Sequence, residues 1–248
     1  MYHEYIFRPL YNGLVGIMDA LPWIDIGLAV VIFTIIVKLA LFPLSKASLL
    51  TQVRMKAIEP EANKIKAEFA SDKQTQALKI MQLYKEKNIK PFSGVLLLFI
   101  QLPILLALIS VFYKVIPTVQ ADLLYSFISV PLVKTHFLGL IDLTQKSLIL
   151  SLLTAIIQFV QLHYSPASRQ LTAKNKDGAP QGTDFASQLS GSMGKQMKFM
   201  LPLLAFASTY WIIPSRFPQA ASIIAIYWAT STLFTLFQEL YIRKKHLG

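Results

Sequence analysis

The chain has 248 residues, of which 54% are hydrophobic and only 15% are charged. An average soluble domain is about 45–50% apolar and about 25% charged, so this composition indicates an integral membrane protein. The net charge is nevertheless +11, which makes the positions of the basic residues informative. The chain contains no cysteine, which excludes disulfides, thiolate nucleophiles and cysteine-ligated zinc.

An amphipathic helix is predicted over residues 5–24. The first residues contain an acid and no basic cluster, so we expect no cleaved targeting segment. Apolar side chains repeat at helical spacing along this stretch and a tryptophan follows them: Leu10, Leu14, Ile17, Leu21 and Trp23. Such a stripe is typical of a helix in the outer membrane interface. The alternative is that these residues, which precede the first apolar run, are disordered.

Five long apolar runs follow in chain order. They cover residues 27–44, 92–113, 147–162, 200–213 and 220–237. A helix needs about 20 residues to cross a bilayer, so the short third and fourth runs predict local thinning of the membrane or extension into flanking aromatic residues. The sequence therefore predicts an all-α integral membrane protein, a single domain with five transmembrane helices.

The basic residues lie mainly on one side of these predicted spans. Of the 24 Lys and Arg residues, 18 lie in residues 45–91, in residues 163–198 and in the tail after Gln238. Five lie in the segments on the opposite side, and one is inside the first span. Because cytoplasmic loops carry an excess of Lys and Arg, we expect the N-terminus outside and the C-terminus in the cytoplasm.

The two cytoplasmic connections differ in character. Residues 45–90 contain no glycine and are predicted to form an antiparallel helical hairpin. Pro60 is expected to kink the first helix or to start a new one, and Ser71 or Asp72 to cap the second. The apolar residues expected to form the seam are Ile58, Ala62, Ile65 and Phe69 in the first helix and Ala77, Met81 and Tyr84 in the second. Most of residues 163–198 lack periodicity, which predicts a mobile cytoplasmic loop.

Polar side chains form an edge on four of the five spans. The third span carries Ser147, Ser151, Thr154, Gln158 and Gln161 on one face, and the fifth carries Trp228, Ser231, Thr232, Thr235 and Gln238. Hydroxyl groups of this kind often pack helices together, each contact contributing only ~0.6–2 kcal/mol. Packing explains the glutamines Gln101, Gln158 and Gln161 less well, because each amide has two donors and an acceptor to satisfy in hydrocarbon.

Lys38 is the one basic residue inside a predicted span, and Thr34 lies one helical turn before it. A lysine near a helix centre costs ~2.5–3.5 kcal/mol on insertion scales and usually faces the bundle interior or a water-filled cavity. Lys38 lies about 9 Å from the cytoplasmic end of its span, so snorkelling of its long side chain is the alternative. We expect no acidic residue inside any span to pair with it.

Other chemistries lack their usual residues in this sequence. Without Asp or Glu in the predicted spans, proton relays and ion-coupled transport have no titrating group. The chain has no phosphate-binding glycine-rich loop, and its four histidines are far apart in sequence without ligand spacing. We therefore expect no enzymatic activity, no cofactor and no metal site.

Several motifs together identify a family. The first span ends in the run from Thr34 to Leu44, Thr-Ile-Ile-Val-Lys-Leu-Ala-Leu-Phe-Pro-Leu, and the hairpin contains Glu59-Pro60-Glu61. The second span contains Phe-Ile-Gln-Leu-Pro-Ile at 99–104, the third Gln158-Phe159 and the last Tyr227-Trp228. With these motifs the chain resembles the YidC/Oxa family of membrane protein insertases over nearly its whole length, in the minimal bacterial form that lacks a large periplasmic domain.

The resemblance implies a five-helix core around a hydrophilic groove that is open to the cytoplasm and to lipid. It also implies a location in the bacterial inner membrane, insertion without ATP hydrolysis, and a hairpin that helps to receive the substrate. Lys38 occupies the place of the family's groove arginine. The lysine retains the positive charge but lacks the bidentate fork of a guanidinium group. The predicted substrate groove comprises Lys38, Thr34, Gln101, Thr154, Gln158, Gln161, Trp228 and Ser231.

The expected partners are nascent membrane proteins and the lipid bilayer, with the ribosome and the Sec translocon as further candidates. No direct recognition of nucleic acid is expected, because the basic residues already account for membrane orientation. The strongest rival function is a small-solute transporter or channel subunit, although the chain shows no internal repeat. An assembly factor dedicated to one membrane complex is a third interpretation.

Overall fold

The computed structural model describes residues 2–90, 93–116, 118–164 and 199–247. Its helices in chain order are η1 His3–Phe7, α1 Arg8–Ala20, α2 Ile26–Ala40, α3 Phe42–Ala57, α4 Glu59–Glu68, α5 Lys73–Glu86, α6 Ser93–Val115, η2 Ala121–Leu123, α7 Leu148–Tyr164, η3 Ser208–Ile212, α10 Ile213–Arg216, η4 Pro218–Ala220 and α11 Ala221–Leu247. Residues 199–207 are also helical and lead into η3. The two strands are β1 His136–Phe137 and β2 Ile141–Asp142.

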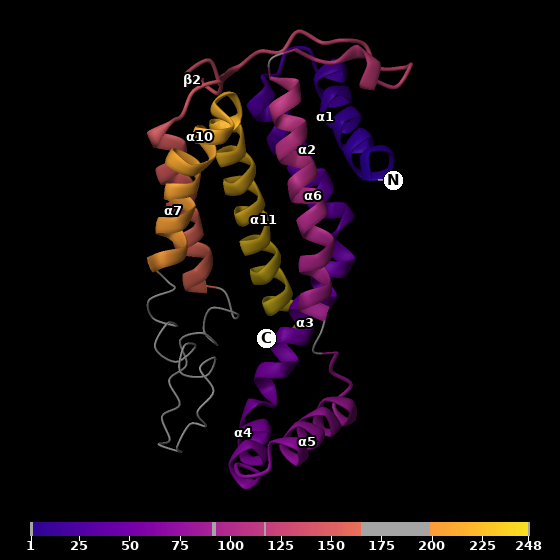
Figure 1. The fold of residues 1–248 in the computed structure, drawn as a ribbon, viewed down its shortest axis with the longest axis vertical. Coiled ribbons are helices and arrows are strands. Elements are labelled where there is room, and N and C mark those ends of the chain that lie inside the picture. Colours follow the sequence, from indigo (N-terminus) through magenta and orange to yellow (C-terminus); the bar gives the residue numbers. More distant parts are fainter. Residues whose placement is uncertain (1, 91–92, 117, 165–198, 248) are drawn as a thin grey trace.

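The long helices stand side by side as a bundle. Figure 1 shows α1 beside one end of this bundle and the α4–α5 hairpin beyond the other. An irregular strap, residues 118–147 between α6 and α7, contains β1 and β2 and crosses the end next to α1. We call these two ends the strap end and the hairpin end. The predicted loop at 163–198 lies outside the described residues from position 165 onward.

The first predicted span is bent. Asp25 caps α2 by accepting a hydrogen bond from the Leu28 N–H at 3.0 Å, and the helix ends at Ala40. The chain then turns by 64° into α3. Pro43 lies in the first turn of α3, where it has no N–H to continue the hydrogen-bond ladder of α2. The predicted range 27–44 thus comprises α2 and the first residues of α3.

Helices also cover the other four predicted spans, with different lengths. Residues 92–113 correspond to α6, 147–162 to α7, and 200–213 to the helical stretch 199–216; α11 extends ten residues beyond the predicted end at 237. Among the described residues, length and composition qualify one helix to cross a membrane alone, residues 221–242 of α11. The α2–α3 pair qualifies only as a bent span, and α7 is a shorter apolar helix of 17 residues. Five crossings therefore stay a prediction.

The predicted interfacial helix is η1 followed by α1. Its buried apolar side chains are Phe7, Tyr11, Leu14, Val15 and Met18, whereas Leu10 and Ile17 of the predicted stripe are only half-buried. The buried face lies against α2 and α6 and joins the main core of the protein. The apolar stripe of α1 thus holds this helix on the bundle.

Buried polar groups tie the strap to α1. The Asn12 side chain is 2% exposed. It donates to the Leu123 carbonyl at 2.9 Å and accepts from the Tyr125 N–H at 2.7 Å. The Tyr11 hydroxyl accepts from the Gln120 N–H at 2.7 Å. These bonds close the strap end over the core.

The strap contains a small sheet that the all-α prediction did not include. β1 and β2 pair antiparallel, with His136 opposite Asp142. The chain reverses between them through positive φ angles of 51° at Leu138 and 72° at Gly139, the backbone conformation that short hairpin connections require. On α2, a Cβ atom at Gly27 would overlap the Phe137 ring, so this glycine lets the sheet approach the helix. Strands of two residues each carry no alternation pattern that sequence reasoning can detect.

The predicted cytoplasmic hairpin consists of α4 and α5. Pro60 lies in the first turn of α4. It therefore starts a new helix, which is one of the two roles expected for it. Gln76 at the start of α5 donates to the Lys66 carbonyl near the end of α4 at 2.8 Å. Lys87, just after α5, pairs with Glu61 near the start of α4 at 3.1 Å. The two helices are therefore antiparallel.

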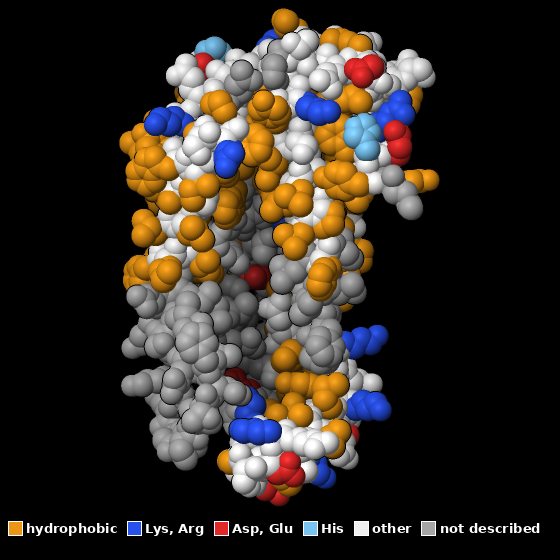
Figure 2. Space-filling view, in the orientation of Figure 1, with side chains coloured by type: hydrophobic (Ala, Val, Ile, Leu, Met, Phe, Trp, Pro, Cys, Tyr) orange, Lys and Arg blue, Asp and Glu red, His pale blue; other side chains and the backbone are white. Residues whose placement is uncertain are grey.

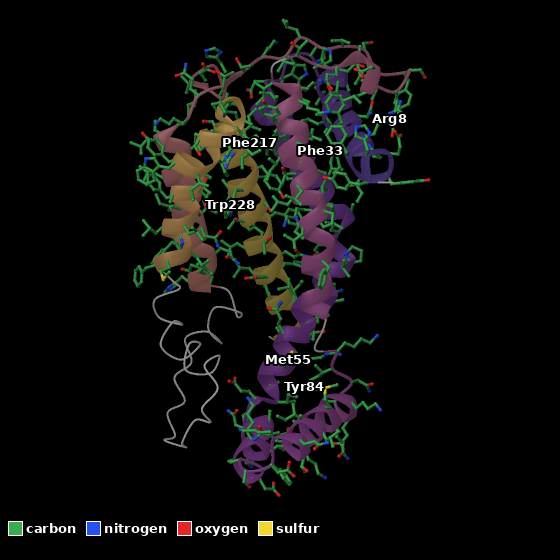
Figure 3. All side chains as sticks on the ribbon, viewed as in Figure 1. Arg8, Phe33, Met55, Tyr84, Phe217 and Trp228 are labelled. Atoms are coloured by element: carbon green, nitrogen blue, oxygen red, sulfur yellow. The ribbon has the colours of Figure 1, made fainter. Side chains whose placement is uncertain are left out.

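The seam of the hairpin differs from the predicted one on α5. Ile58, Ala62, Leu83 and Ile89 are buried together, with Met55, Ile65 and Tyr84 packed against them; Figure 3 labels Met55 and Tyr84 at this junction. Ala77 and Met81 were predicted to lie in the seam but are exposed. Gln76 occupies the seam instead, because its amide bonds the end of α4. This turns the buried face of α5 by one residue, about 100°.

We predict that Asn12→Ala destabilises the protein by about 1–3 kcal/mol, because the Leu123 carbonyl and the Tyr125 N–H lose a buried partner. Thermal unfolding in detergent should show a lower Tm for this variant. Asn63→Ala, which removes an exposed amide from α4, is the matched control and should leave the Tm unchanged. Equal Tm values for Asn12→Ala and the parent would contradict the role of Asn12.

A second prediction concerns the cap of α5. The Asp72 carboxylate accepts from the Gln74 and Thr75 N–H groups and from the Thr75 hydroxyl, and the Thr75 bonds lower the pKa of Asp72 below its ordinary value of 3.8. The cap therefore stabilises α5 above pH 3.8 and is lost as the pH falls through the lowered pKa. Asp72→Ala should speed amide hydrogen exchange at 74–76 at neutral pH. Ser71→Ala should not; equal rates in both variants would contradict this assignment.

Candidate functional site

Six polar side chains of α11 lie in one sector of the helix. They are Tyr227, Trp228, Ser231, Thr235, Gln238 and Glu239. At 100° per residue these six positions fall within about 120° of the helix circumference. α11 packs against α7 on one side and against α2 on the other. The sector therefore faces helices that are distant in sequence, and its side chains can bond to them.

One edge of the sector faces α6 and α3. The Gln101 amide of α6 lies 3.5 Å from the Tyr227 hydroxyl, at the outer limit of a hydrogen bond. Further toward the hairpin end, the Gln238 amide donates to the Ser45 hydroxyl of α3. The sequence placed Gln101 and Gln238 among the polar residues of the spans, and the structure brings Gln101 of α6 and Ser45 of α3 against α11.

The other edge faces α7. The Trp228 indole N–H donates to the Gln158 side-chain oxygen at 3.2 Å, and Figure 3 shows Trp228 between α7 and α11. The Gln158 amide donates to the Gln161 oxygen at 3.2 Å. The Gln161 amide lies 3.5 Å from Oε1 of Glu239. Four polar side chains thus form a continuous connection along one wall of the site.

Lys38 points toward the middle of the same sector. It lies in the last turn of α2, and its Nζ is 3.4 Å from the Thr235 hydroxyl. Its side chain is half-buried, and the ion pairs between described residues do not include it. Of the two interpretations of Lys38, this direction favours the one in which the ammonium group faces a polar space between helices.

Two predicted groove residues are instead buried in helix contacts. Thr34 is 2% exposed and Thr154 is 0% exposed. The Thr34 hydroxyl donates to the Val30 carbonyl at 2.6 Å, and the Thr154 hydroxyl donates to the Leu150 carbonyl at 2.8 Å, with the Ala225 carbonyl 3.1 Å away. Packing accounts for both of them, as the sequence allowed for hydroxyl groups.

The remaining predicted site residues are all partly exposed: Lys38, Gln101, Gln158, Gln161, Trp228 and Ser231. On α2, Lys38 lies closer to the hairpin end than the buried Thr34. On α7, Gln158 and Gln161 lie closer to that end than the buried Thr154. On α11, residues 221–227 are all buried, and partial exposure begins at Trp228. The polar sector of α11 is therefore buried at Tyr227, partly exposed at Trp228, Ser231 and Thr235, and buried again at Gln238 and Glu239.

The surface is hollowed beside this site. Figure 2 shows a recess between α6 on one side and α7 with the helical stretch 199–216 on the other, with an acidic side chain in its depth. The outer faces of the flanking helices are apolar (Figure 2). Their exposed side chains include Ile149, Leu152, Ile156, Leu203, Leu204 and Trp211. A recess with an acidic side chain in its depth thus lies between walls whose outer surfaces suit hydrocarbon.

The site offers hydrogen-bonding groups and one ammonium charge. The described residues contain no group of three or more His, Asp or Glu side chains arranged to hold a metal ion. The arrangement can therefore solvate polar or anionic groups close to an apolar surface. None of its described side chains forms a nucleophile and base pair of the kind that catalysis requires.

Sequence reasoning missed Glu239 as a site residue. The prediction that no acidic residue lies within a span is wrong, because Glu239 lies inside the apolar stretch 221–242 of α11 and is 6% exposed. The error arose from ending the last span at 237. Glu239 lies one turn after Thr235, on the polar face that the sequence had already defined, and this spacing was the signal that could have found it.

Comparisons with known proteins agree with the motifs. The family model described as "60Kd inner membrane protein" matches residues 18–247. A "Membrane protein insertase YidC" of Clostridium acetobutylicum is 33% identical over 207 residues, 84% of this chain and 76% of the relative. One of Fusobacterium nucleatum is 27% identical over 89% of this chain and 87% of the relative.

The length of the relatives varies. A "Membrane protein insertase YidC" of Stutzerimonas stutzeri is 24% identical over 88% of this chain, and the chain spans only 32% of that longer relative. The match thus includes relatives of similar size as well as longer ones. Because the family model covers residues 18–247, the chain belongs to the 60Kd inner membrane protein family, the YidC/Oxa1 family of membrane proteins.

Proposed function

We propose that this protein inserts nascent membrane proteins into the bacterial inner membrane through the polar recess beside α11. The observation that carries the proposal is the polar sector of α11, which is buried at Tyr227 and partly exposed at Trp228, Ser231 and Thr235. The names of the relatives support the same role.

The recess lowers the cost of moving a polar flank into the membrane. Each polar backbone group without a partner in hydrocarbon costs several kcal/mol. Amide and hydroxyl groups of Gln101, Gln158, Gln161 and Ser231 supply partners partway across. The apolar segment of the substrate meanwhile contacts the apolar outer surfaces of α7 and the stretch 199–216 and leaves sideways into lipid. The process needs no nucleotide, because hydrophobic transfer into the bilayer drives it.

Lys38 attracts acidic residues in the translocated flank. Its ammonium group lies in the recess beside Thr235, where the surrounding apolar helices reduce solvent screening. The lysine makes single point-charge contacts, whereas arginine would make bidentate ones. The groove of this proposal comprises the six partly exposed residues, with Thr34 and Thr154 acting as supports.

The proposed orientation places the hairpin end in the cytoplasm and the strap end outside. It rests on the distribution of basic residues, of which 18 of 24 lie in the connections and the tail assigned to the cytoplasmic side. In this orientation the α4–α5 hairpin lies below the open side of the recess and contacts incoming chains. The ribosome and the Sec translocon are the partners that would bring a substrate to this position.

Site-specific photocrosslinking tests the proposal. A photoreactive amino acid at position 101 or 158 should crosslink to a stalled nascent membrane protein in vesicles without ATP. The same amino acid at position 140, where Leu140 is 84% exposed in the strap, is the control and should give no such product. Uptake of a small solute by these vesicles without nascent-chain crosslinks would instead support a transporter and contradict the proposal.

The charge of Lys38 is tested by substitution. Lys38→Ala should lower the insertion of substrates with acidic flanks roughly threefold to fivefold, because a partly exposed ion pair contributes at most ~1 kcal/mol. Lys38→Arg should retain insertion, and Lys146→Ala, which removes an exposed cation from the strap end, is the matched control. Equal insertion by the alanine variant and the parent would rule out the electrostatic role.

A further inference from the structure

An open cavity of about 620 Å³ lies at the strap end, where the chain enters α2. It is separate from the recess beside α11, because none of its lining residues belongs to the polar sector or to the predicted groove. Small-molecule sites in proteins commonly measure about 300–1,000 Å³, so this cavity is large enough for a ligand. Its lining includes Trp23, Asp25 and Leu28 on one side and Lys134, His136 and Leu138 of the strap on the other.

Hydrogen bonds fix the two walls of this cavity relative to each other. The Asp25 carboxylate accepts from the Leu28 N–H and from the Leu138 N–H, each at 3.0 Å. The Ile26 N–H donates to the Lys134 carbonyl at 3.0 Å. Asp25 is 8% exposed and each of its oxygens accepts a backbone N–H, so this carboxylate holds the walls together. The cavity is therefore a built feature of the contact between α2 and the strap.

Lys134 is the cation that the cavity offers to a ligand. Its side chain is exposed, and the ion pairs between described residues do not include it. Its Nζ donates to the Pro22 carbonyl at 2.9 Å, which uses one of the three N–H donors of an ammonium group. The exposed His136 ring adds a further N–H donor on the same wall. A positive charge with free donors suits the oxygens of a phosphate group.

An apolar stripe on α2 leads away from the cavity toward the hairpin end. It consists of Leu28, Ile32, Ile35 and Leu39, which lie on one face of the helix at helical spacing. Leu28 and Ile32 are half-buried, whereas Ile35 and Leu39 are 37% and 55% exposed. The stripe is about 16 Å long, and one leaflet of the hydrocarbon core is about 15 Å thick. Its length therefore suits one acyl chain.

Trp23 indicates the depth of the cavity in the membrane. Its side chain lines the cavity and is 73% exposed. Tryptophan rings are enriched at the level where hydrocarbon meets water. With Trp23 at this boundary, Lys134 lies among the lipid headgroups and the α2 stripe lies in hydrocarbon. A charged cavity followed by an apolar stripe matches a molecule with a polar head and an apolar tail, which the bilayer supplies.

We propose that the cavity between α2 and the strap binds one phospholipid molecule. Lys134 and His136 hold its phosphate group, and one acyl chain lies along the α2 stripe from Leu28 to Leu39. The bound lipid joins the strap to α2 on the surface of the bundle. This site does not involve the recess beside α11, so the proposal is independent of the proposed insertase function.

A phospholipid with a photoreactive group in one acyl chain tests the proposal. The full protein in detergent is irradiated with a limiting amount of this lipid, and mass spectrometry locates the labelled residues. The α2 stripe should be labelled more strongly than the exposed apolar face of α7 at 149–156, which measures unspecific contact. Lys134→Ala should lower labelling of the stripe about threefold to fivefold, the effect of one exposed ion pair, and leave labelling of α7 unchanged. Lys146→Ala, which removes an exposed cation of the strap end outside the cavity, is the matched control and should change neither.

Two further variants separate the charge of Lys134 from its bond to the Pro22 carbonyl. Lys134→Gln retains an N–H donor for this carbonyl but removes the charge, so it should lower labelling of the stripe as Lys134→Ala does. Lys134→Arg retains both the donor and the charge and should be labelled like the parent. Parent-like labelling of Lys134→Gln would show that Lys134 only holds the strap in place, and would overturn the proposal.

Two other probes identify the part of the ligand that is recognised. A diacylglycerol with the same photoreactive group lacks the phosphate, so it should label the stripe weakly and to the same extent in the parent and in Lys134→Ala. Inorganic phosphate at the concentration of the lipid should not reduce labelling by the phospholipid. Displacement by inorganic phosphate would show a site for free anions, and equal labelling of the stripe and α7 in the parent would show bulk lipid only. Either result would overturn the proposal.

Discussion

The structure depends on one constraint: a polar group surrounded by apolar helices requires a hydrogen-bond partner. α11 places six polar side chains in one sector, and each neighbouring helix supplies partners for some of them. α6 and α3 contact one edge, α7 the other, and Lys38 of α2 points to the middle. These contacts hold the helices around a recess while the apolar faces of the bundle turn outward.

The same constraint explains why the two ends of the bundle differ. At the strap end, Asn12 and Asp25 bond the strap backbone, and Ser222 of α11 donates to the Gln145 carbonyl. Those polar groups have their hydrogen-bond partners within the protein. Closer to the hairpin end, Gln158, Gln161 and Lys38 stay partly exposed and retain groups for another molecule, whereas Gln238 and Glu239 are buried.

Much of the site could be predicted from residue spacing alone. Serine, threonine and glutamine at helical spacing identified the polar face of α7, and the register that contains Thr235 and Gln238 identified that of α11. Sequence reasoning could not distinguish Thr34 and Thr154 from exposed groove residues, because burial depends on neighbouring helices. It also misplaced the α5 seam, because Gln76 bonds the end of α4, and missed Glu239 by ending α11 too early.

The sequence by itself determined the helical membrane character, the distribution of basic residues and the family, because composition and local periodicity carry that information. Only the tertiary structure decided which polar edges meet. The contacts between Trp228 and Gln158 and between Gln161 and Glu239 join residues 70 and 78 positions apart. The bend between α2 and α3 and the rotation of α5 likewise depend on long-range contacts and backbone geometry, which no local pattern encodes.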